Sequence, residues 1–268
     1  MSALYEGKVV VLTGASVGIG RALALELARQ HPRLVLAARD EARLQEVAEE
    51  CRAAGAEALV ARTDVAVQEE CQTLVERSLA RFDRIDALVL NAGMSMWARF
   101  DEVDDLSIFE SLMRVNYLGC VWLTYFALSE LKRSRGQIVA VASLAGLTGV
   151  PTRTGYAASK HALIGFCDSL RIELDGTGVD VTVVAPDFVV SEIHRRSLGA
   201  HGQPLGESPM KESKIMSAEE CARMIVRAME GRKRLVLGSL RGKFGRWARL
   251  LAPGVVDRIA RRAVERGR

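Results

Sequence analysis

Short apolar runs alternate with longer amphipathic stretches along the chain, up to about residue 185. Runs that are apolar at nearly every position are typical of parallel strands covered by helices on both faces. The expected strands are Lys8–Leu12, Leu34–Ala37, Glu57–Arg62, Ala87–Leu90, Gln137–Ala142 and Asp180–Ala185. The expected helices are Gly18–Gln30, Glu41–Ala54, Gln68–Phe82, Leu106–Leu131 (in one piece or broken) and Tyr156–Asp175. Because strands and helices alternate with short connections, the sequence predicts an α/β fold, a single domain with a Rossmann-type, doubly wound parallel sheet.

The alternation stops after the last of these strands. Five Gly and Pro residues lie within residues 188–216, and a long irregular loop in a compact domain is usually functional. We therefore expect an irregular substrate lid over about residues 188–216. A capping box, Ser217 with Glu220, then predicts a helix that runs to Glu230, and Arg234–Leu237 is a candidate for one more strand.

Composition excludes several classes of protein. The 268 residues are 49% hydrophobic and 26% charged, which is ordinary for a globular chain with a packed core. The five cysteines are scattered without paired spacing, so we expect reduced thiols and a cytoplasmic protein. No apolar run approaches the roughly 18 residues of a membrane span, and the first predicted strand begins at Lys8, so we expect neither a membrane span nor a signal peptide. The four histidines lack the spacing of metal ligands, so we expect no metal.

The net charge of +4 is distributed unevenly. The segment Gly231–Arg268 holds 12 of the 37 basic residues and two of the 33 acidic ones, so the rest of the chain is mildly acidic. We expect no nucleic-acid partner for it. Apolar residues such as Trp247 and Leu250 recur at helical spacing near the C-terminus, which predicts a basic amphipathic helical extension over residues 239–268. Such a stripe suits peripheral contact with an anionic membrane, and equally packing on the body or on a second subunit.

A glycine-rich turn follows the first predicted strand. Its sequence, Thr-Gly-Ala-Ser-Val-Gly-Ile-Gly, leads directly into a predicted helix. Gly14, Gly18 and Gly20 allow a tight turn and a close approach of the backbone to a pyrophosphate, which would lie at the helix N-terminus. The sequence therefore predicts a dinucleotide site.

The second predicted strand ends without the acidic residue that binds an adenosine ribose. Ala38 stands at that position and Arg39 follows it. An arginine is suited to a 2′-phosphate, so we expect NADP(H) rather than NAD(H). Asp40 lies close by, and a solvated Arg39 is the alternative interpretation.

Tyr156 and Lys160 stand four residues apart on a predicted helix, and hence on one of its faces. A lysine ammonium near a phenol favours the phenolate. Ser143 follows the strand Gln137–Ala142, at the end of the sheet where doubly wound folds hold ligands. These residue types suit proton transfer to or from a carbonyl oxygen.

Together these segments resemble the short-chain dehydrogenase/reductase family, in its compact single-domain branch. The resemblance covers about residues 7–190 and includes, beyond the glycine turn, Asp64-Val65 and Asn91-Ala92-Gly93. It implies a catalytic tetrad of Asn116, Ser143, Tyr156 and Lys160. The cofactor-binding residues expected on these grounds are Gly14, Ser16, Gly18, Ile19, Gly20, Arg39, Asp64, Val65, Asn91, Ala92, Gly93, Tyr156, Lys160, Pro186, Val189 and Ser191.

The resemblance implies an NADP(H)-dependent oxidoreductase that transfers a hydride between nicotinamide and a carbonyl carbon, with residues 1–238 as its cofactor-binding and catalytic domain. Ser143 would hold the carbonyl oxygen, and Tyr156 would supply or remove the proton. Lys160 would bind the nicotinamide ribose, and Asn116 would hold a relay water. One position departs from the family pattern, because Asp187 stands where a glycine is usual. Its effect on the turn stays open at this point.

The candidate substrate walls are apolar: Met94, Trp97, Leu144 and Phe188. We therefore expect a lipophilic ketone, aldehyde or secondary alcohol, steroid-like or acyl-lipid-like, rather than a sugar or a charged acid. Met94 and Trp97 suit packing under a helix equally well. Arg153 suits contact with an anionic headgroup, but we interpret it as a solvated side chain.

Two other functions stay open. A 3-oxoacyl reductase would differ by requiring a carrier protein. A non-catalytic NADPH-sensing regulator belongs to another class, and such proteins tend to lose the tyrosine or the lysine, both of which this chain keeps. The resemblance also implies a homodimer or homotetramer, formed through the helices Leu106–Leu131 and Tyr156–Asp175.

Overall fold

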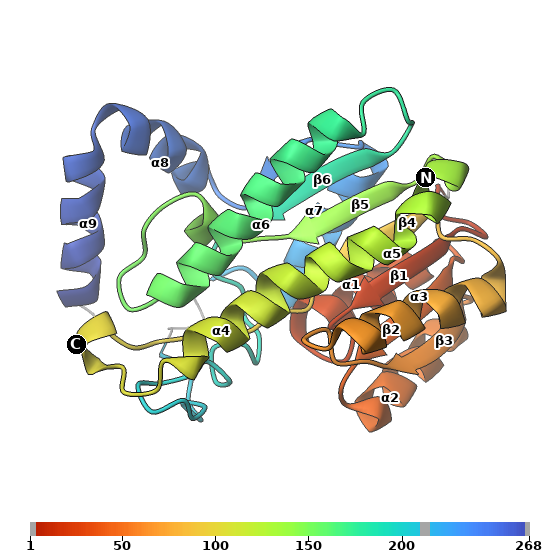
Figure 1. The fold of residues 1–268 in the computed structure, drawn as a ribbon, viewed down its shortest axis with the longest axis horizontal. Helices are drawn as coiled ribbons and strands as arrows, with labels where there is room; N and C mark the ends of the chain where they lie inside the picture. Colours follow the sequence, from red (N-terminus) through yellow and green to blue (C-terminus); the bar gives the residue numbers. More distant parts are fainter. Residues whose placement is uncertain (1–3, 210–214, 266–268) are drawn as a thin grey trace.

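Seven parallel strands form one sheet in the order β3-β2-β1-β4-β5-β6-β7 (Figure 1). The computed structural model describes residues 4–209 and 215–265 of the chain. The strands are β1 (Val9–Thr13), β2 (Arg33–Ala38), β3 (Glu57–Arg62), β4 (Ala87–Leu90), β5 (Gln137–Val141), β6 (Asp180–Ala185) and β7 (Leu235–Leu237). Each expected strand is confirmed with ends that differ by at most one residue, because runs of buried β-branched and leucine residues mark them clearly.

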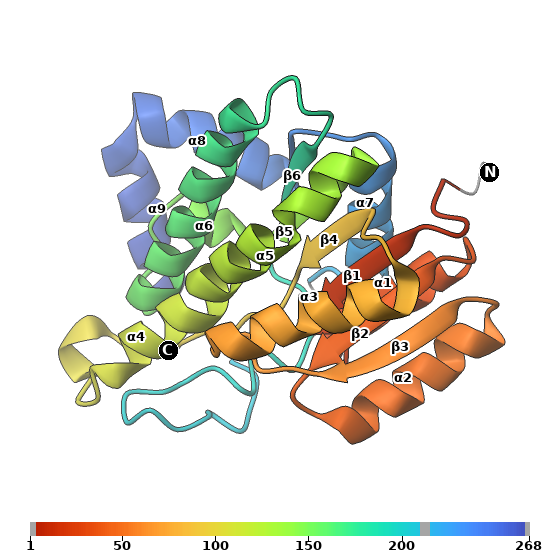
Figure 2. The same ribbon diagram turned by 45° about the vertical axis from the view of Figure 1, so that its right-hand side comes forward.

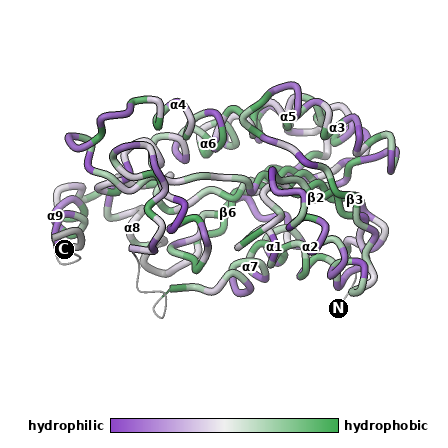
Figure 3. Tube along the Cα trace, turned by 90° about the horizontal axis from the view of Figure 1, so that it is seen from below, coloured by the Kyte–Doolittle hydropathy of each residue, from purple (hydrophilic) through white to green (hydrophobic). Residues whose placement is uncertain are grey.

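Two layers of helices cover the sheet (Figure 3). The helices are α1 (Gly18–Ala28), α2 (Glu41–Ala53), α3 (Gln68–Phe82), α4 (Ser107–Met113), α5 (Gly119–Ser134), α6 (Thr154–Glu173), α7 (Ala218–Glu230), α8 (Leu240–Leu251) and α9 (Pro253–Glu265). One buried cluster joins α1, α2 and α7 to one face of the sheet, and a second joins α3, α5 and α6 to the other. All five cysteines are free thiols within these buried regions. The predicted fold, an α/β single domain with a doubly wound parallel sheet, is confirmed.

The strand order reverses between β1 and β4. On one side of this point the chain winds outward through β2 and β3, and on the other through β5, β6 and β7. Because connections leave in opposite directions there, a crevice opens at the carboxyl ends of the strands, where such folds bind ligands. The loops that carry the predicted site residues all start at this edge.

The predicted helix Leu106–Leu131 is broken. Arg114–Leu118 forms a π-helical turn between α4 and α5, and Asn116 lies within it. π-Turns inside helices occur frequently at functional sites. The wider turn interrupts the regular helix at one of the predicted tetrad positions.

The described part of the segment 188–216 lacks helices and extended strands, as expected for the predicted lid. Individual backbone hydrogen bonds join this segment to the rest of the chain. The N–H of Trp97 donates to the carbonyl oxygen of Leu198 (2.8 Å), and the N–H of Leu198 donates to that of Ser95 (2.9 Å). The segment therefore lies against the loop that follows β4.

Two helices, α8 and α9, follow β7 and lie at the opposite end of the sheet from β3 and α2 (Figures 1 and 2). Ser239 caps α8, since its Oγ accepts a hydrogen bond from the N–H of Gly242 (3.1 Å). Large apolar side chains of these helices are exposed: Phe244, Trp247, Leu250, Leu251, Val255 and Ile259. The interpretation of a stripe buried against the body of this chain is therefore wrong for these residues. None of the described helices is both long and apolar enough to cross a bilayer.

Candidate active site

The glycines of the turn after β1 occupy positions where a larger residue would not fit. Gly14 and Gly18 have φ values of 66° and 54°, in the left-handed region that favours glycine. A Cβ on Gly20 would lie 1.9 Å from the carbonyl oxygen of Gly14, and one on Gly18 would lie 3.1 Å from Cβ of Ser191. The turn is a tight backbone cradle at the N-terminus of α1, which suits a pyrophosphate.

Asn91 and Thr13 join this turn to the loop after β4. Asn91 Nδ2 donates to the carbonyl oxygens of Thr13 (2.9 Å) and Gly14 (3.2 Å). Thr13 Oγ1 accepts from the N–H groups of Asn91 (3.0 Å) and Ala92 (3.1 Å). Thr13 carried no prediction of its own, although it precedes the turn directly. The predicted cofactor residues Asn91 and Ala92 thus lie against the glycines.

Arg39 is exposed after the end of β2. The carboxylate of the neighbouring Asp40 binds to Arg43, three residues further along. Its Oδ1 accepts a hydrogen bond from the N–H of Arg43 (3.1 Å) and caps α2, and its Oδ2 lies 3.3 Å from the Arg43 guanidinium. Arg43 also pairs with Glu192 of the lid segment (3.1 Å). Asp40 is therefore held as a helix cap beside Arg39.

The other expected cofactor residues follow the carboxyl ends of β1, β3 and β6. Asp64 Oδ1 accepts a hydrogen bond from the N–H of Ala66 (3.0 Å). Ser191 lies against Gly18, and its Oγ donates to the carbonyl oxygen of Val189 (3.4 Å). The remaining members sit at the same edge of the sheet: Ser16, Ile19, Val65 and Pro186.

Asn116 is completely buried and connects two segments of the site. Its Oδ1 accepts from the N–H of Met94 (2.9 Å), and its Nδ2 donates to the Met94 carbonyl oxygen (2.9 Å). Nδ2 also donates to Ser159 Oγ (2.9 Å). The amide therefore fixes the loop after β4 against α6, and Ser159 is a supporting residue that the sequence did not single out.

Lys160 and Tyr156 are buried on one face of α6, as expected. Lys160 Nζ donates to the carbonyl oxygen of Val141 (3.0 Å) and lies 6.0 Å from the centroid of the Tyr156 ring. A Cβ on Gly93 would lie 3.6 Å from Nζ and 3.2 Å from Asn116 Oδ1. The ammonium group is thus enclosed by α6, the end of β5 and the loop after β4.

Ser143 follows β5 in extended conformation and caps the short turn Leu144–Gly146. Its Oγ accepts a hydrogen bond from the N–H of Ala145 (3.2 Å), which leaves the hydroxyl proton for another acceptor. A Cβ on Gly146 would lie 2.7 Å from the carbonyl oxygen of Lys160, so this turn packs closely on α6. The tetrad positions therefore come together at the carboxyl edge of the sheet.

Two of the expected substrate walls, Trp97 and Phe188, surround Arg153. The guanidinium carbon lies 4.3 Å from the ring centroid of Trp97, 5.1 Å from that of Phe188 and 5.7 Å from that of Tyr156. Arg153 is only 5% exposed, so its interpretation as a solvated side chain is wrong. Its position at the N-cap of α6, three residues before Tyr156, was a signal for its place in the site.

The other two expected walls, Met94 and Leu144, are half-buried. Met94 packs on the small cluster that contains Tyr156 and Met96. Leu144 meets α8, since a Cβ on Gly242 would lie 2.5 Å from Leu144 Cδ2. α8 therefore reaches the edge of the candidate site.

Asp187 is accommodated without a glycine-like backbone. It is absent from the described non-glycine residues with a left-handed φ, which are His31, Asp83, Arg135, Thr152 and Arg232. Its Oδ2 accepts a hydrogen bond from Ser239 Oγ (2.8 Å), the N-cap of α8. The departure from the family pattern thus links the loop after β6 to the C-terminal extension.

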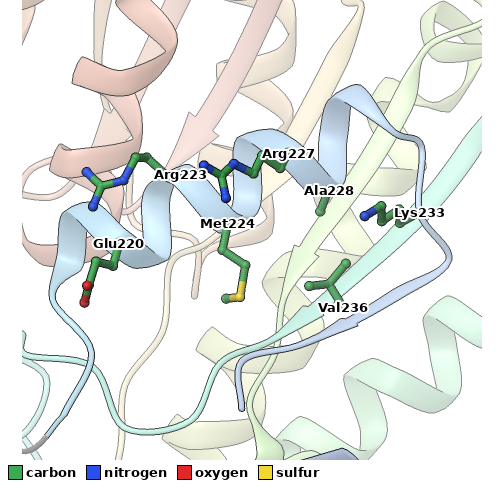
Figure 4. Close-up of a pocket in the computed structure, with 7 residues that line it drawn as sticks. All are labelled: Glu220, Arg223, Met224, Arg227, Ala228, Lys233 and Val236. Carbon is green, nitrogen blue, oxygen red and sulfur yellow. The ribbon is translucent and has the colours of Figure 1, made fainter. Parts of the chain in front are cut away.

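A groove of about 380 Å³ lies elsewhere, between α7 and β7 (Figure 4). Its walls contain none of the predicted site residues: Glu220, Arg223, Met224, Arg227, Ala228, Lys233 and Val236. Among the described residues, no group of three His, Cys, Asp or Glu side chains is arranged to hold a metal ion.

Comparisons with known proteins agree with this geometry. The family model for short chain dehydrogenases matches residues 8–200. An 11-beta-hydroxysteroid dehydrogenase A from Sesamum indicum is 37% identical over 261 residues, which cover 95% of this chain and 75% of that protein. An 11-beta-hydroxysteroid dehydrogenase-like protein 4A from Arabidopsis thaliana is 42% identical over 222 residues, 82% of this chain and 73% of that protein.

Solved structures resemble the chain over most of its length. A short chain dehydrogenase/reductase from Burkholderia phymatum, in complex with NAD, has a TM-score of 0.82 at 26% identity and covers 94% of this chain and 95% of its own. An alcohol dehydrogenase from Thermococcus sibiricus, complexed with 5-hydroxy-NADP, has a TM-score of 0.73 at 29% identity, with coverages of 86% and 94%. The matched family model, the relatives and the fold lead to one conclusion: this chain belongs to the short-chain dehydrogenase/reductase family of oxidoreductases.

Proposed function

We propose that the protein is an NADP(H)-dependent oxidoreductase that interconverts a carbonyl compound with a largely apolar body and the corresponding secondary or primary alcohol. The main observation behind this proposal is that Tyr156, Lys160 and Asn116 are buried close to one another at the carboxyl edge of the sheet. Ser143 and the glycine cradle lie at the same edge. Family members named as hydroxysteroid dehydrogenases support a lipophilic substrate.

The cradle fits a dinucleotide. The space that a Cβ on Gly14, Gly18 or Gly20 would fill is backbone surface, which lets a pyrophosphate approach the N–H groups of α1. Arg39 would hold a 2′-phosphate, and the engagement of Asp40 as a helix cap supports NADP(H), because that carboxylate is not left to bind a ribose hydroxyl. Bound there, the cofactor supplies or accepts the hydride.

Residues of the chain would bind the carbonyl oxygen, transfer its proton and position the cofactor. Ser143 donates a hydrogen bond to the carbonyl oxygen and stabilises negative charge that develops on it. Tyr156 donates a proton to the same oxygen, or removes it in the reverse direction. Lys160, whose Nζ lies 6.0 Å from the centroid of the Tyr156 ring, would hold the nicotinamide ribose. Asn116 joins the loop after β4 to α6.

The test combines cofactor titration with a substitution. We expect purified protein to bind NADPH more tightly than NADH, and Arg39→Ala to remove the difference. Tyr156→Phe removes the proton donor with little change in volume, so turnover of a ketone panel should fall by about 10²-fold or more with NADPH binding retained. Unchanged turnover would refute the assignment of Tyr156, and NADPH binding without turnover by the unmodified chain would favour a sensing role.

We further propose that α8 and α9 rest on an anionic lipid surface. The exposed apolar side chains on these helices support it, as does the excess of basic residues within Gly231–Arg268. Trp247→Ser with Leu251→Ser should reduce co-sedimentation with phosphatidylserine vesicles at least several-fold. Leu4→Ser is the control, because Leu4 is also an exposed apolar side chain and lies outside the helices α5, α6, α8 and α9. Equal pelleting of all three proteins would remove the membrane role.

A homodimer or homotetramer is proposed through α5 and α6. Large apolar side chains, Tyr125 and Ile172, are exposed on these two helices, and Gly165 of α6 has open space around it. Such a surface permits close packing of helices from a second copy. Light scattering should give a mass of two or four times 29.2 kDa, and Gly165→Glu should shift it towards 29.2 kDa. A monomeric mass for the unmodified chain contradicts the proposal.

A further inference from the structure

Arg153 is a buried cation with nitrogen atoms that have no hydrogen-bond partner. It stands at the N-terminal end of α6 and is 5% exposed. Within the described part of the chain, neither Nε nor Nη2 finds an acceptor. Buried polar groups are nearly always hydrogen-bonded, because a buried N–H without a partner loses its hydration without replacement. These two nitrogens point to an acceptor that comes from outside the chain.

The aromatic rings around the guanidinium explain only part of its burial. Trp97, Phe188 and Tyr156 lie within 4.3 to 5.7 Å of the guanidinium carbon. Ring faces attract the charge, but they do not accept the in-plane hydrogen bonds that a guanidinium donates. The rings therefore stabilise the cation and hold it in one place, while its N–H groups remain unsatisfied.

The backbone before Arg153 is held in an unfavourable conformation. Thr152 is β-branched and has a φ of 66°, a region that such residues rarely adopt. The N–H of Ala98 donates to the Thr152 carbonyl oxygen (2.9 Å) and keeps this turn against the loop after β4. Strained residues of this kind persist where the surroundings fix them, and they cluster at functional sites. The turn brings Arg153 between that loop and the lid.

Among the described residues, none supplies a countercharge to Arg153. Burial lowers the pKa of Arg153 to about 10, and the neighbouring Tyr156 opposes this effect only in part. The side chain is thus still cationic at neutral pH. No carboxylate of the described residues forms an ion pair with it. A carboxylate from a ligand would supply both the missing charge and two acceptor oxygens that match the guanidinium edge.

We propose that Arg153 is a substrate-binding residue, and that the substrate is an oxo acid, or the matching hydroxy acid, with an otherwise apolar body. The inference rests on the proposed oxidoreductase function and makes its substrate class narrower. Arg153 lies beside Tyr156, so the carboxylate binds a few bonds from the reacting carbonyl carbon. Trp97 and Phe188 contact the apolar part of the molecule. This proposal keeps the apolar body that we expected for the substrate and adds a carboxylate to it, contrary to the expectation of an uncharged molecule.

The test compares acids with their neutral esters. The probes are 4-, 5- and 6-oxodecanoate and the three methyl esters, reduced with saturating NADPH. We expect kcat/KM to favour one acid over its ester by about 10- to 100-fold, as charge-assisted hydrogen bonds usually do. In Arg153→Met the ratio should fall to about one. Arg153→Lys keeps the charge without the bidentate edge and should give an intermediate ratio.

Two alternatives predict different results. If Arg153 only supports Tyr156, Arg153→Met shifts the pH profile of acid and ester alike, with their ratio unchanged. If Arg153 only stabilises the fold, thermal unfolding of the NADPH complex changes and the ratio again stays the same. Either outcome, or a ratio near one in the unmodified protein, overturns the proposal.

A binding measurement separates the inference from the proposed function. Decanoate and decanamide have the same chain and cannot be reduced as ketones are. Quenching of tryptophan fluorescence in the NADPH complex should show tighter binding of decanoate, and Arg153→Met should abolish the difference. If no oxo compound is turned over but this preference is found, the anion site stands and the oxidoreductase proposal fails. Equal binding of the two compounds refutes the anion site.

Discussion

Replacing Gly20 by alanine tests whether the turn after β1 is the cofactor cradle. Gly20 is in the first turn of α1, where alanine would normally be favoured over glycine by about 1 kcal/mol. Here a Cβ would lie 1.9 Å from the carbonyl oxygen of Gly14 and 2.7 Å from Asn91 Nδ2, and contacts become ordinary only from 3.4 Å. The first neighbour is backbone, so it cannot rotate away.

The cost follows from this geometry. The turn must open by about 1.5 Å before van der Waals contact is normal. Forcing extra atoms into a packed region typically costs about 1–3 kcal/mol, which exceeds the gain in helix propensity. A displacement of this size also moves the N–H groups that would face a pyrophosphate. We expect the free energy of unfolding to fall by about 1–2 kcal/mol and the Kd for NADPH to rise at least about tenfold.

The assay is NADPH titration by fluorescence together with urea unfolding of the free protein. Gly245→Ala is the matched control, because Gly245 is inside α8 and has nothing within 4 Å of its would-be Cβ. That variant should keep the Kd, and its unfolding free energy should stay the same or rise by up to about 1 kcal/mol. If Gly20→Ala binds NADPH as tightly as the unmodified chain, the turn after β1 is not where the cofactor binds.

Substitutions at two further contacts test the structure outside the cradle. Burial raises the pKa of Asp86, but hydrogen bonds from Arg84 and the N–H of Val9 outweigh it and hold the pKa below its usual value. The stabilisation is present above the ordinary carboxyl pKa and is lost as the pH falls through the lowered value. Asp86→Asn should therefore cost about 1–3 kcal/mol at pH 7, and progressively less as the pH falls below the ordinary carboxyl range, by urea unfolding. Asp187→Ala and Ser239→Ala break the same hydrogen bond and should both speed tryptic cleavage of the C-terminal extension, Ser239→Ala more so because it also removes the N-cap of α8. An additive effect in the double variant would contradict a shared contact.

The fold was predictable because each element is marked by a local pattern. The strands of the parallel sheet are short runs of valine, leucine and alanine, and burial on both faces leaves little ambiguity about their ends. The glycine turn, Ser143 and the pair Tyr156 and Lys160 stood out for a similar reason, because they follow strands or share a helix face. The tetrad as a set, and Asn116 above all, was expected only from the family resemblance, since Asn116 lies in a π-turn between two helices.

Arg153 shows what a local pattern cannot give. Its spacing to Tyr156 is visible in the sequence, but its burial depends on Trp97 and Phe188, which come from two loops far apart in the chain. The same holds for Asp187, whose partner Ser239 is 52 residues further along. An irregular loop carries no periodicity that would say which side chain it covers. The cofactor half of the site was therefore predicted in more detail than the substrate half.

The substrate half is also where the C-terminal extension meets the body. Leu144, which follows Ser143, is in close contact with Gly242 of α8. Arg249 of the same helix donates to the carbonyl oxygen of Leu147 and lies 3.1 Å from His161 Nε2 on α6. The glycine cradle, by contrast, is formed by β1, α1 and the loop after β4. If α8 changes position when the protein binds to a lipid surface, the walls around the substrate move before the cofactor cradle does. Addition of lipid vesicles should therefore alter KM for the carbonyl compound more than Kd for NADPH.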